Sequence, residues 1–197
     1  MSATKFWDDL YERRPAGTPK VNARLAEIAG PLTPGTALDL GCGGGGDALW
    51  LAARGWRVTA VDLSGAAVRS LQRRGDPVTA LRVDLAEDFP EGTFDLVSAQ
   101  YFHTPFALDR ARVLRTAAGS VNPGGRLVVV DHGSAAPWSW DQDAEFATPG
   151  EVAAELDLDP ADWSIDRAEA AERLATGPGG RTATVVDHIL ILRRAGR

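Results

Sequence analysis

Three aspartates follow apolar segments of the sequence, and a cluster of glycines lies directly after the first of them. Asp39 stands in "TALDLG" and is followed by "GCGGGG", Asp62 ends "WRVTAVD", and Asp84 follows "VTALRV". Consecutive glycines are poor material for the interior of a helix or strand, because each loses much backbone entropy on folding. They do allow close approach to the backbone, and carboxylates accept hydrogen bonds from hydroxyl and amino groups. The pattern predicts a shared ligand at these segments.

The elements that must position these residues alternate along the chain. Apolar runs predict strands, and apolar residues at helical spacing predict helices between them. Such alternation favours a mainly parallel sheet with helices on both faces, which binds ligands beyond the carboxyl ends of its strands. The expected strands are 36–41, 56–64, 78–85, 93–102, 126–133 and 182–194, and the expected helices are 46–55, 65–75, 107–121 and 148–156.

The segment 163–175, "WSIDRAEAAERLA", fits two structures. Its alanine and glutamate content favours a helix. Its place before "TGPGG" and the last strand favours the first arm of a hairpin. We predict a strand.

Two alternatives for the glycine segment come from phosphate-binding motifs. A P-loop requires a lysine and a hydroxyl after its last glycine, and neither follows Gly46. A dinucleotide-binding loop fits better, since Gly41, Gly43 and Gly46 match its pattern and Asp62 follows about 20 residues later. We find no Tyr-x-x-x-Lys pair and no separate substrate domain, but an NAD(P)-dependent oxidoreductase stays an alternative.

The motifs taken together resemble the class I S-adenosylmethionine-dependent methyltransferases. The matching features are Asp39 with Gly41, Gly43 and Gly45, the strand-end acids Asp62 and Asp84, "FDLVSAQYFH" and "NPGGRLVVVDHG", and they cover residues 36–197. The resemblance implies an α/β, doubly wound, Rossmann-like fold with a mainly parallel seven-stranded sheet, an antiparallel last strand and helices on both faces. It also implies S-adenosyl-L-methionine as cofactor and methyl transfer as the reaction.

The same resemblance assigns parts of the cofactor to residues. It places the ribose hydroxyls at Asp62, the adenine amino group at Asp84 and a ring nitrogen at the backbone N–H of Leu85. The strand edge at 98–100 would face the methionine amino group or the sulfonium. The predicted cofactor-binding residues are Trp7, Tyr11, Arg14, Asp39, Gly41, Gly43, Gly45, Asp47, Asp62, Leu63, Asp84, Leu85 and Gln100.

The N-terminal "FWDDLYERRP" resembles a segment of the tellurite-resistance and thiol-methyltransferase-like branch, where it covers the cofactor. This resemblance implies that Trp7 and Tyr11 form a lid and that Arg14 pairs with the cofactor carboxylate. It also implies a role for Asp47, because that branch has an asparagine or aspartate there. An amphipathic helix packed on the sheet is the alternative. We expect one domain, 1–197, with a helical lid segment at 1–35 and the core at 36–197.

His103 follows the fourth expected strand, where this fold places the methyl group, so it is the candidate for substrate contact or proton removal. His132 and Trp138 are candidates for the acceptor pocket. A structural role, in which a loop carbonyl accepts from the imidazole, is the alternative for His103. The three histidines and Cys42 lack metal-ligand spacing, so we expect no metal.

Charge and composition limit the partners. The net charge of −6 argues against nucleic acid. The arginines at 69, 73 and 74 and at 110, 112 and 115 fit solvated helix faces. The sequence lacks an N-P-P-Y-type tetrapeptide at "AQYF", which favours a small-molecule acceptor.

One cysteine and no apolar leader or membrane span predict a cytoplasmic protein. A binding module without chemistry is a third possibility, and the oligomeric state stays open.

Overall fold

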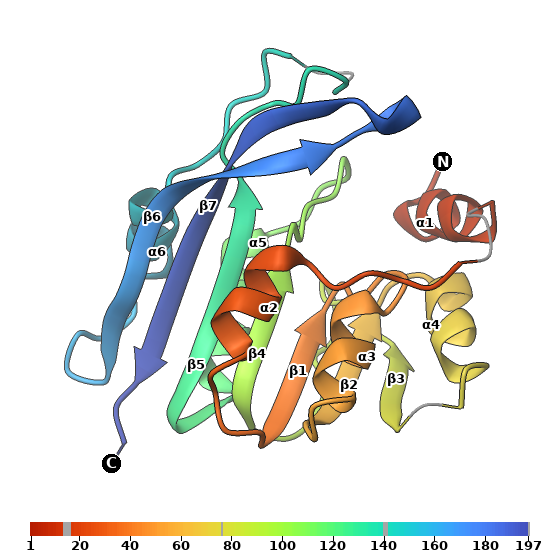
Figure 1. Ribbon diagram of the computed structural model, residues 1–197. Helices are drawn as coiled ribbons and strands as arrows, with labels where there is room; N and C mark the ends of the chain where they lie inside the picture. Colours follow the sequence, from red (N-terminus) through yellow and green to blue (C-terminus); the bar gives the residue numbers. More distant parts are fainter. Residues whose placement is uncertain (14–16, 76, 140–141, 197) are drawn as a thin grey trace.

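A seven-stranded sheet forms the centre of the computed structural model, which describes residues 1–13, 17–75, 77–139 and 142–196 (Figure 1). The strand order is β3-β2-β1-β4-β5-β7-β6. Neighbours from β3 to β5 are parallel, β7 is antiparallel to β5, and β6 is antiparallel to β7. The strands are β1 Thr36–Leu40, β2 Arg57–Asp62, β3 Val78–Arg82, β4 Phe94–Gln100, β5 Val121–His132, β6 Trp163–Thr176 and β7 Thr182–Arg194.

Helices cover both faces of this sheet. Leu25, Leu51 and Leu71 bury one face beneath α2, α3 and α4, and Leu114 and Leu156 bury the other beneath α5 and α6 (Figure 1). The predicted doubly wound fold is therefore confirmed. The helices are α1 Ala3–Glu12, α2 Ala23–Ala29, α3 Gly46–Ala52, α4 Gly65–Gln72, α5 Arg110–Gly119 and α6 Pro149–Leu156, with a 3₁₀ turn at Pro178–Gly180. None of the described helices has the length and apolar character of a membrane span.

The register of the central strands brings the predicted site residues to one edge. β1 is buried along almost its whole length, as a central parallel strand must be. Its Asp39 lies beside Ala60 of β2 and Ser98 of β4. Asp62 closes β2, so the carboxyl ends of three neighbouring strands meet where ligands bind in such sheets.

Several element boundaries differ from the predicted ones. The helix expected at 107–121 is shorter, because the Asp109 carboxylate caps α5 by accepting from the backbone N–H of Arg112 at 2.9 Å. β5 begins at Val121, five residues early, because Val121 pairs with Phe94 ahead of a register shift in β4. β3 ends at Arg82, so Asp84 lies in the loop after the strand.

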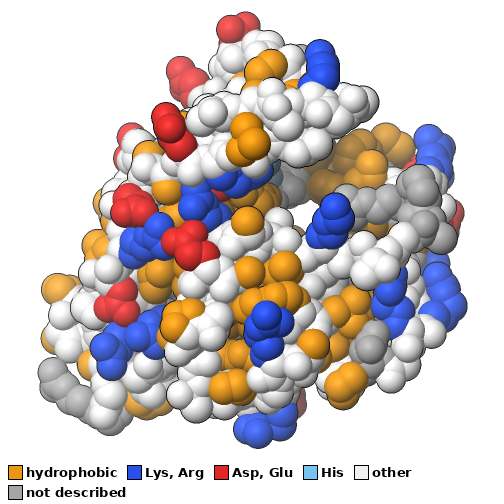
Figure 2. Space-filling model, viewed as in Figure 1, with side chains coloured by type: hydrophobic (Ala, Val, Ile, Leu, Met, Phe, Trp, Pro, Cys, Tyr) orange, Lys and Arg blue, Asp and Glu red, His pale blue; other side chains and the backbone are white. Residues whose placement is uncertain are grey.

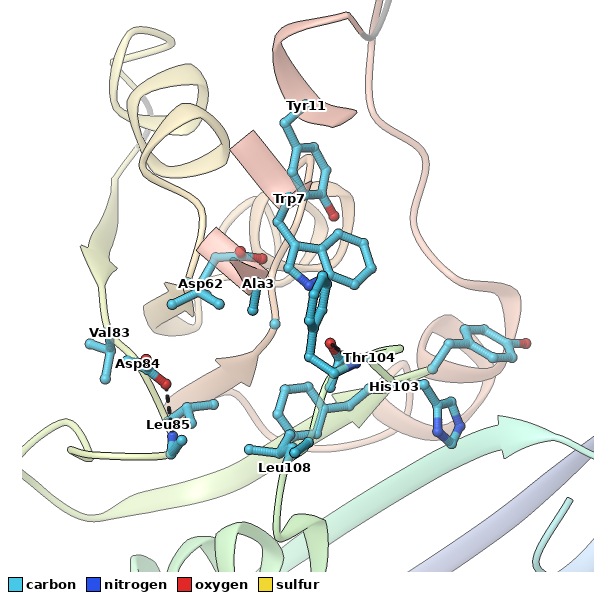
Figure 3. Close-up of a pocket in the computed structure, with 17 residues that line it drawn as sticks. Ala3, Trp7, Tyr11, Asp62, Val83, Asp84, Leu85, His103, Thr104 and Leu108 are labelled. Carbon is cyan, nitrogen blue, oxygen red and sulfur yellow. Dashed lines mark hydrogen bonds between the residues drawn. The ribbon is translucent and has the colours of Figure 1, made fainter. Parts of the chain in front are cut away.

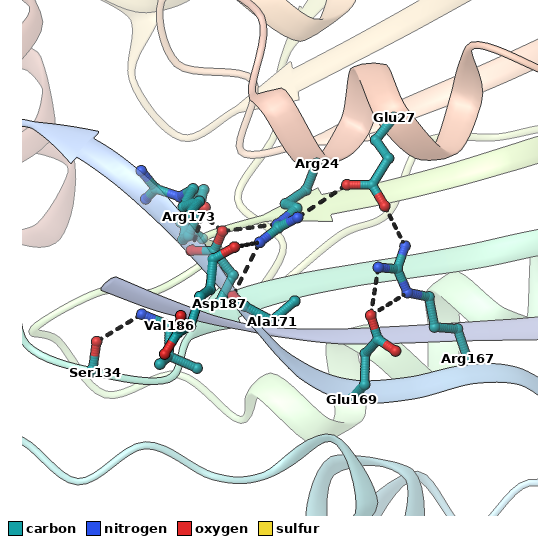
Figure 4. A network of polar contacts seen from close by, with 11 residues as sticks. Arg24, Glu27, Ser134, Arg167, Glu169, Ala171, Arg173, Val186 and Asp187 are labelled. Atoms are coloured by element: carbon teal, nitrogen blue, oxygen red, sulfur yellow. Dashed lines mark hydrogen bonds and ion pairs between the residues drawn. The ribbon is translucent and has the colours of Figure 1, made fainter. Parts of the chain in front are cut away.

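A network of ion pairs joins the β6–β7 hairpin to the rest of the sheet (Figure 4). The fully buried Asp187 of β7 accepts from Nε of Arg24 in α2 at 3.0 Å and from Nε of Arg173 in β6 at 2.7 Å. Its second oxygen accepts from the Tyr101 hydroxyl at 2.9 Å. A buried carboxylate requires such partners, so Asp187 fixes the hairpin against α2 and the end of β4.

The N-terminal segment is held to the glycine loop and to α4. The carboxylate of Asp47 accepts from the backbone N–H of Asn22 at 2.7 Å and from its side-chain amide at 2.6 Å. Asp8 in α1 accepts from the Ser64 hydroxyl at 2.7 Å and from the Ala66 N–H at 3.0 Å. The molecule is hollowed between α1 and the β6–β7 hairpin (Figure 2), and the candidate site lies in this region.

Candidate active site

The loop between β1 and α3 needs glycine for two separate reasons. Gly41, Gly43 and Gly45 all have positive φ, a conformation that strains other residues. A Cβ on Gly43 would collide with the Tyr11 hydroxyl, and one on Gly46 would collide with the backbone oxygen of Lys20. The N-terminal segment therefore packs directly on this loop, which explains a glycine at position 46.

Asp62 is positioned by the backbone on both of its sides. One carboxylate oxygen accepts from the Gly43 N–H at 2.8 Å, and the other accepts from the Ser64 N–H at 2.8 Å. Burial raises the pKa of Asp62 above its ordinary value, although the two N–H donors oppose that shift. Each oxygen of a carboxylate can accept more than one hydrogen bond, so Asp62 can still accept from a ligand in the cavity that it lines.

Two buried oxygens at the ends of β1 and β4 have no hydrogen-bond partner within the described structure. They are Oδ2 of Asp39 and Oε1 of Gln100. The Gln100 amide is oriented by its NH₂ group, which donates to the Ser98 hydroxyl at 3.0 Å. Burial, followed by the charges of Asp47 and Asp62, raises the pKa of Asp39 well above its ordinary value. Because unpaired buried acceptors are costly, this pair fits a ligand that brings a donor such as an amino group.

A cavity of about 200 Å³ opens beside these residues and is covered by α1 (Figure 3). In this view Trp7 lies between Asp62 and Asp84 on one side and His103 on the other. The Trp7 and Tyr11 rings stack with centroids 6.3 Å apart. Asp84 accepts from the Ala86 N–H at 3.0 Å, which forms the turn after β3. The predicted residues that line the cavity are Trp7, Tyr11, Gly41, Asp62, Leu63, Asp84, Leu85 and His103.

The remaining predicted cofactor residues lie outside that lining. Asp47 is buried against Asn22, and burial raises its pKa. Asp39 and Gln100 are buried next to cavity-lining segments, within two positions of Gly41 and Tyr101, whereas Gly43 and Gly45 shape the loop. Arg14 falls outside the described residues.

Two aromatic residues after β4 belong to the site although no motif pointed to their roles. The Phe102 ring packs so closely on Gly41 that a Cβ there would lie 2.9 Å from it. Tyr101 has φ +51, which is unusual for a residue with a side chain. Burial and the charge of Asp187 raise the pKa of Tyr101 to about 12, so its hydroxyl stays a hydrogen-bond donor. The motif "QYFH" indicates that both residues follow the fourth strand, but it does not predict the positive φ of Tyr101.

His103 forms a chain of contacts with β5 and α5. Its Nε2 lies 3.0 Å from Oδ1 of Asp131, and Arg110 donates to both oxygens of that carboxylate at 2.7 Å. Burial raises the pKa of Asp131, but the His103 hydrogen bond and the Arg110 charge outweigh it and hold the pKa below its ordinary value. Arg110 therefore belongs to the site, and the prediction that it lies on a solvated helix face is wrong. The helical spacing of the arginines does not predict that the Arg110 side chain points from α5 toward β5.

The predicted acceptor residues line a second cavity, of about 630 Å³. His132 lies against the Tyr101 ring, with centroids 4.5 Å apart. Partial burial and the neighbouring His103 lower the pKa of His132. Trp138 also lines this cavity and packs on Gly177 at the tip of the β6–β7 hairpin. Within the described ranges, no group of three or more histidine, cysteine or acidic side chains is arranged to hold a metal ion.

Comparisons with known proteins find similar sequences. Residues 38–129 match a family model described as a methyltransferase domain. The chain is 34% identical over 137 residues to the 27-O-demethylrifamycin SV methyltransferase of Amycolatopsis mediterranei, covering 64% of this chain and 49% of that one. It is 35% identical over 136 residues to the ribosomal RNA small subunit methyltransferase C of Chromohalobacter salexigens, covering 65% and 40%. This chain thus spans about half or less of the length of these two relatives.

Solved structures share the fold over nearly all of the chain. A structure described as showing the conversion of a disulfide bond into a thioacetal group during echinomycin biosynthesis superposes with a TM-score of 0.72 at 24% identity, covering 100% of this chain and 93% of that one. TehB from Haemophilus influenzae superposes with a TM-score of 0.68 at 19% identity, covering 96% and 67%. Residues 38–129 are therefore similar to a methyltransferase domain, and the chain shares its fold with these solved structures.

Proposed function

We propose that this protein transfers a methyl group from S-adenosylmethionine to a small molecule. The observation that carries the proposal is the pair of buried acceptors, Asp39 Oδ2 and Gln100 Oε1, that have no partner among the described residues. They lie within two positions of Gly41 and Tyr101, which line the cavity together with Asp62 and Asp84. S-adenosylmethionine has an amino group, two ribose hydroxyls and an adenine amino group, which are donors for these acceptors. When bound, it supplies a methyl group made electrophilic by its sulfonium.

The residues of this chain take three roles in the proposal. Asp39 and Gln100 bind the amino acid end, Asp62 the ribose and Asp84 the adenine. Trp7 and Tyr11 cover the site from α1 and exclude water. Asp47 positions the loop through Asn22 rather than touching the ligand.

The net negative charge of the chain and the cover that α1 forms over the site favour a small acceptor over RNA. The net charge of −6 disfavours binding of a polyanion. The relative named for 27-O-demethylrifamycin SV also supports a small acceptor, whereas the relative named for ribosomal RNA supports the alternative. A cytoplasmic location is part of the same proposal.

Isothermal titration with S-adenosylhomocysteine tests the cofactor. The intact chain should bind it, and Asp62→Asn should weaken binding roughly 10- to 100-fold, since a charged acceptor strengthens each hydrogen bond. Asp88→Asn is the matched control, because Asp88 is exposed and accepts only from the backbone N–H of Phe89 among its described contacts. A folded chain that binds NADH but not S-adenosylhomocysteine would instead support the oxidoreductase alternative.

A further inference from the structure

The two cavities meet at one side chain. Of the described residues that line either cavity, His103 alone lines both. The smaller cavity holds the residues proposed for the cofactor, so a molecule in the larger cavity reaches the cofactor past this imidazole. The His103 side chain is 45% exposed, which leaves it accessible from these spaces.

The orientation of His103 suits it to accept a proton. The Asp131 carboxylate is ionised beside Arg110 and can only accept hydrogen bonds, so Nε2 of His103 must carry the hydrogen that it shares with Asp131. In the neutral imidazole the lone pair is then on Nδ1. Arg110 also donates from Nε to the backbone oxygen of Phe102 at 3.0 Å, which fixes the guanidinium behind Asp131.

The walls of the larger cavity favour a flat, uncharged ligand. Trp138, Phe146 and His132 contribute rings, with His132 and Phe146 in an edge-to-face arrangement at 6.0 Å. The arginines of the lining are already paired, Arg110 with Asp131 and Arg173 with the buried Asp187. The other titratable groups of this lining are His103, Asp131, His132 and Glu145, so among the described lining residues no unpaired arginine demands an anionic ligand.

We propose that the larger cavity binds the methyl acceptor, that the acceptor is a phenol, and that His103 takes its proton while Asp131 and Arg110 position the imidazole. This inference rests on the proposed function and names its substrate class. The phenol O–H bond breaks and its proton moves to Nδ1 of His103. The oxygen electron pair forms the new O–CH₃ bond, and the electrons of the broken S–CH₃ bond stay on sulfur, which leaves S-adenosylhomocysteine.

Binding is tested with the full chain saturated with S-adenosylhomocysteine and titrated with 2-naphthol. We expect saturable binding that Trp138→Leu weakens at least 10-fold, because the indole forms a wall of the cavity. Trp50→Leu is the control, since Trp50 lies in α3 beneath Arg54 and lines neither cavity. A chain that binds S-adenosylhomocysteine but not 2-naphthol would overturn this inference and leave the proposed function intact.

The role of Asp131 is tested by comparing 2-naphthol with 2-naphthalenethiol as acceptors. With the naphthol, Asp131→Asn should lower kcat about 100-fold with KM little changed, since general-base catalysis contributes this order. The loss should shrink as the pH rises and the naphthol ionises unaided. The thiol is already ionised at neutral pH, so its methylation should be little affected.

Two further variants keep the test decisive. His103→Gln leaves the Arg110–Asp131 pair in place and should give the same acceptor-dependent loss even if Asp131→Asn folds poorly. Asp166→Asn also removes an acid paired with an arginine, Arg126, but on β6 away from both cavities, and should leave the rates unchanged. Equal losses for naphthol and thiol, or no turnover of bound naphthol by the intact enzyme, would contradict the proposed base.

Discussion

At the scale of single residues, Gly43 has two properties that a substitution would disturb: its left-handed backbone and its contact with Tyr11. A comparison with Gly75 distinguishes their effects on stability and on ligand binding. Gly43 has φ +51 and faces the Tyr11 hydroxyl, whereas Gly75 has φ +72 and, its chain neighbours aside, no atom of the described residues lies within 4 Å of the place that a Cβ would take. Both Gly43→Ala and Gly75→Ala should lose about 1–2 kcal/mol of stability to left-handed backbone strain. Gly43→Ala should lose more, because the methyl group displaces Tyr11 and with it α1.

Chemical denaturation and titration with S-adenosylhomocysteine measure this difference. We expect weaker ligand binding for Gly43→Ala only. Equal effects of the two substitutions on stability and on affinity would show that the Tyr11 contact contributes nothing.

Asp39 provides a prediction about pH. Because burial and the neighbouring Asp47 and Asp62 raise its folded pKa, the folded chain keeps a proton that the unfolded chain releases above about pH 4. The stability linked to Asp39 is therefore present at low pH and is lost as the pH rises toward the raised pKa. Asp39→Asn cannot ionise, so its Tm relative to the wild type should increase from about pH 4 to pH 8.

Thermal unfolding without ligand, at intervals across that range, gives the measurement. Asp88→Asn controls for the removal of one exposed negative charge. A Tm difference for Asp39→Asn that stays constant with pH would contradict a raised pKa at this position.

The sequence predicted the residues that line the smaller cavity better than the residues that support them. Asp62 and Asp84 could be found because each follows an apolar strand, and strand ends share one edge of the sheet. The positioning role of Asp47 depends on Asn22, 25 positions away, and that of Arg110 on Asp131, 21 positions away. No local pattern encodes such pairings, because they form only when the chain folds.

At the scale of elements, the Asp8 carboxylate attaches α1 to α4 by two hydrogen bonds, beside an exposed ion pair between Glu12 and Arg69 at 3.8 Å. The Ser64 hydroxyl and Ala66 N–H lower the pKa of Asp8, so the contact is present near neutral pH and is lost only in acid. Asp8→Ala should release α1 and weaken S-adenosylhomocysteine binding roughly 5- to 10-fold, mainly through faster dissociation. Asp9→Ala is the matched control, because Asp9 contacts only Lys5 and Arg13 of its own segment among the described ion pairs.

Stopped-flow release of the ligand and hydrogen exchange in residues 3–12 test this role of α1. We expect faster exchange in Asp8→Ala than in Asp9→Ala. Unchanged exchange and release in Asp8→Ala would show that the aromatic contacts of Trp7 and Tyr11 hold the helix without Asp8.

The elements show where local and long-range signals compete. "WSIDRAEAAERLA" favours a helix by composition, yet it forms β6 because β7 offers it a continuous antiparallel partner from Thr182 to Arg194. The position before a glycine-rich turn was the informative signal. The early start of β5 could not be predicted in this way, since it depends on the pairing of Val121 with Phe94 across the sheet.

At the scale of the whole molecule, several polar contacts join the N-terminal segment to the core, and three of them involve buried or half-buried side chains. Asp8 contacts α4, Asn22 contacts Asp47, and Arg24 contacts Asp187. These attachments lie on both sides of the glycine loop and in the β6–β7 hairpin. The prediction of one domain over 1–197 therefore leads us to expect that α1, α2 and the sheet unfold together.

A ligand that binds the folded chain should then stabilise all of it in one transition. At a concentration of 100 times Kd, S-adenosylhomocysteine should raise the free energy of unfolding by about 2.7 kcal/mol. This increase corresponds to a rise in Tm of roughly 5–10 °C for a chain of this size. Scanning calorimetry should show a single peak that moves by this amount, and Asp62→Asn should show a smaller rise at the same ligand concentration. Two separate peaks, of which the ligand moves only one, would show instead that the N-terminal segment and the core are independent units.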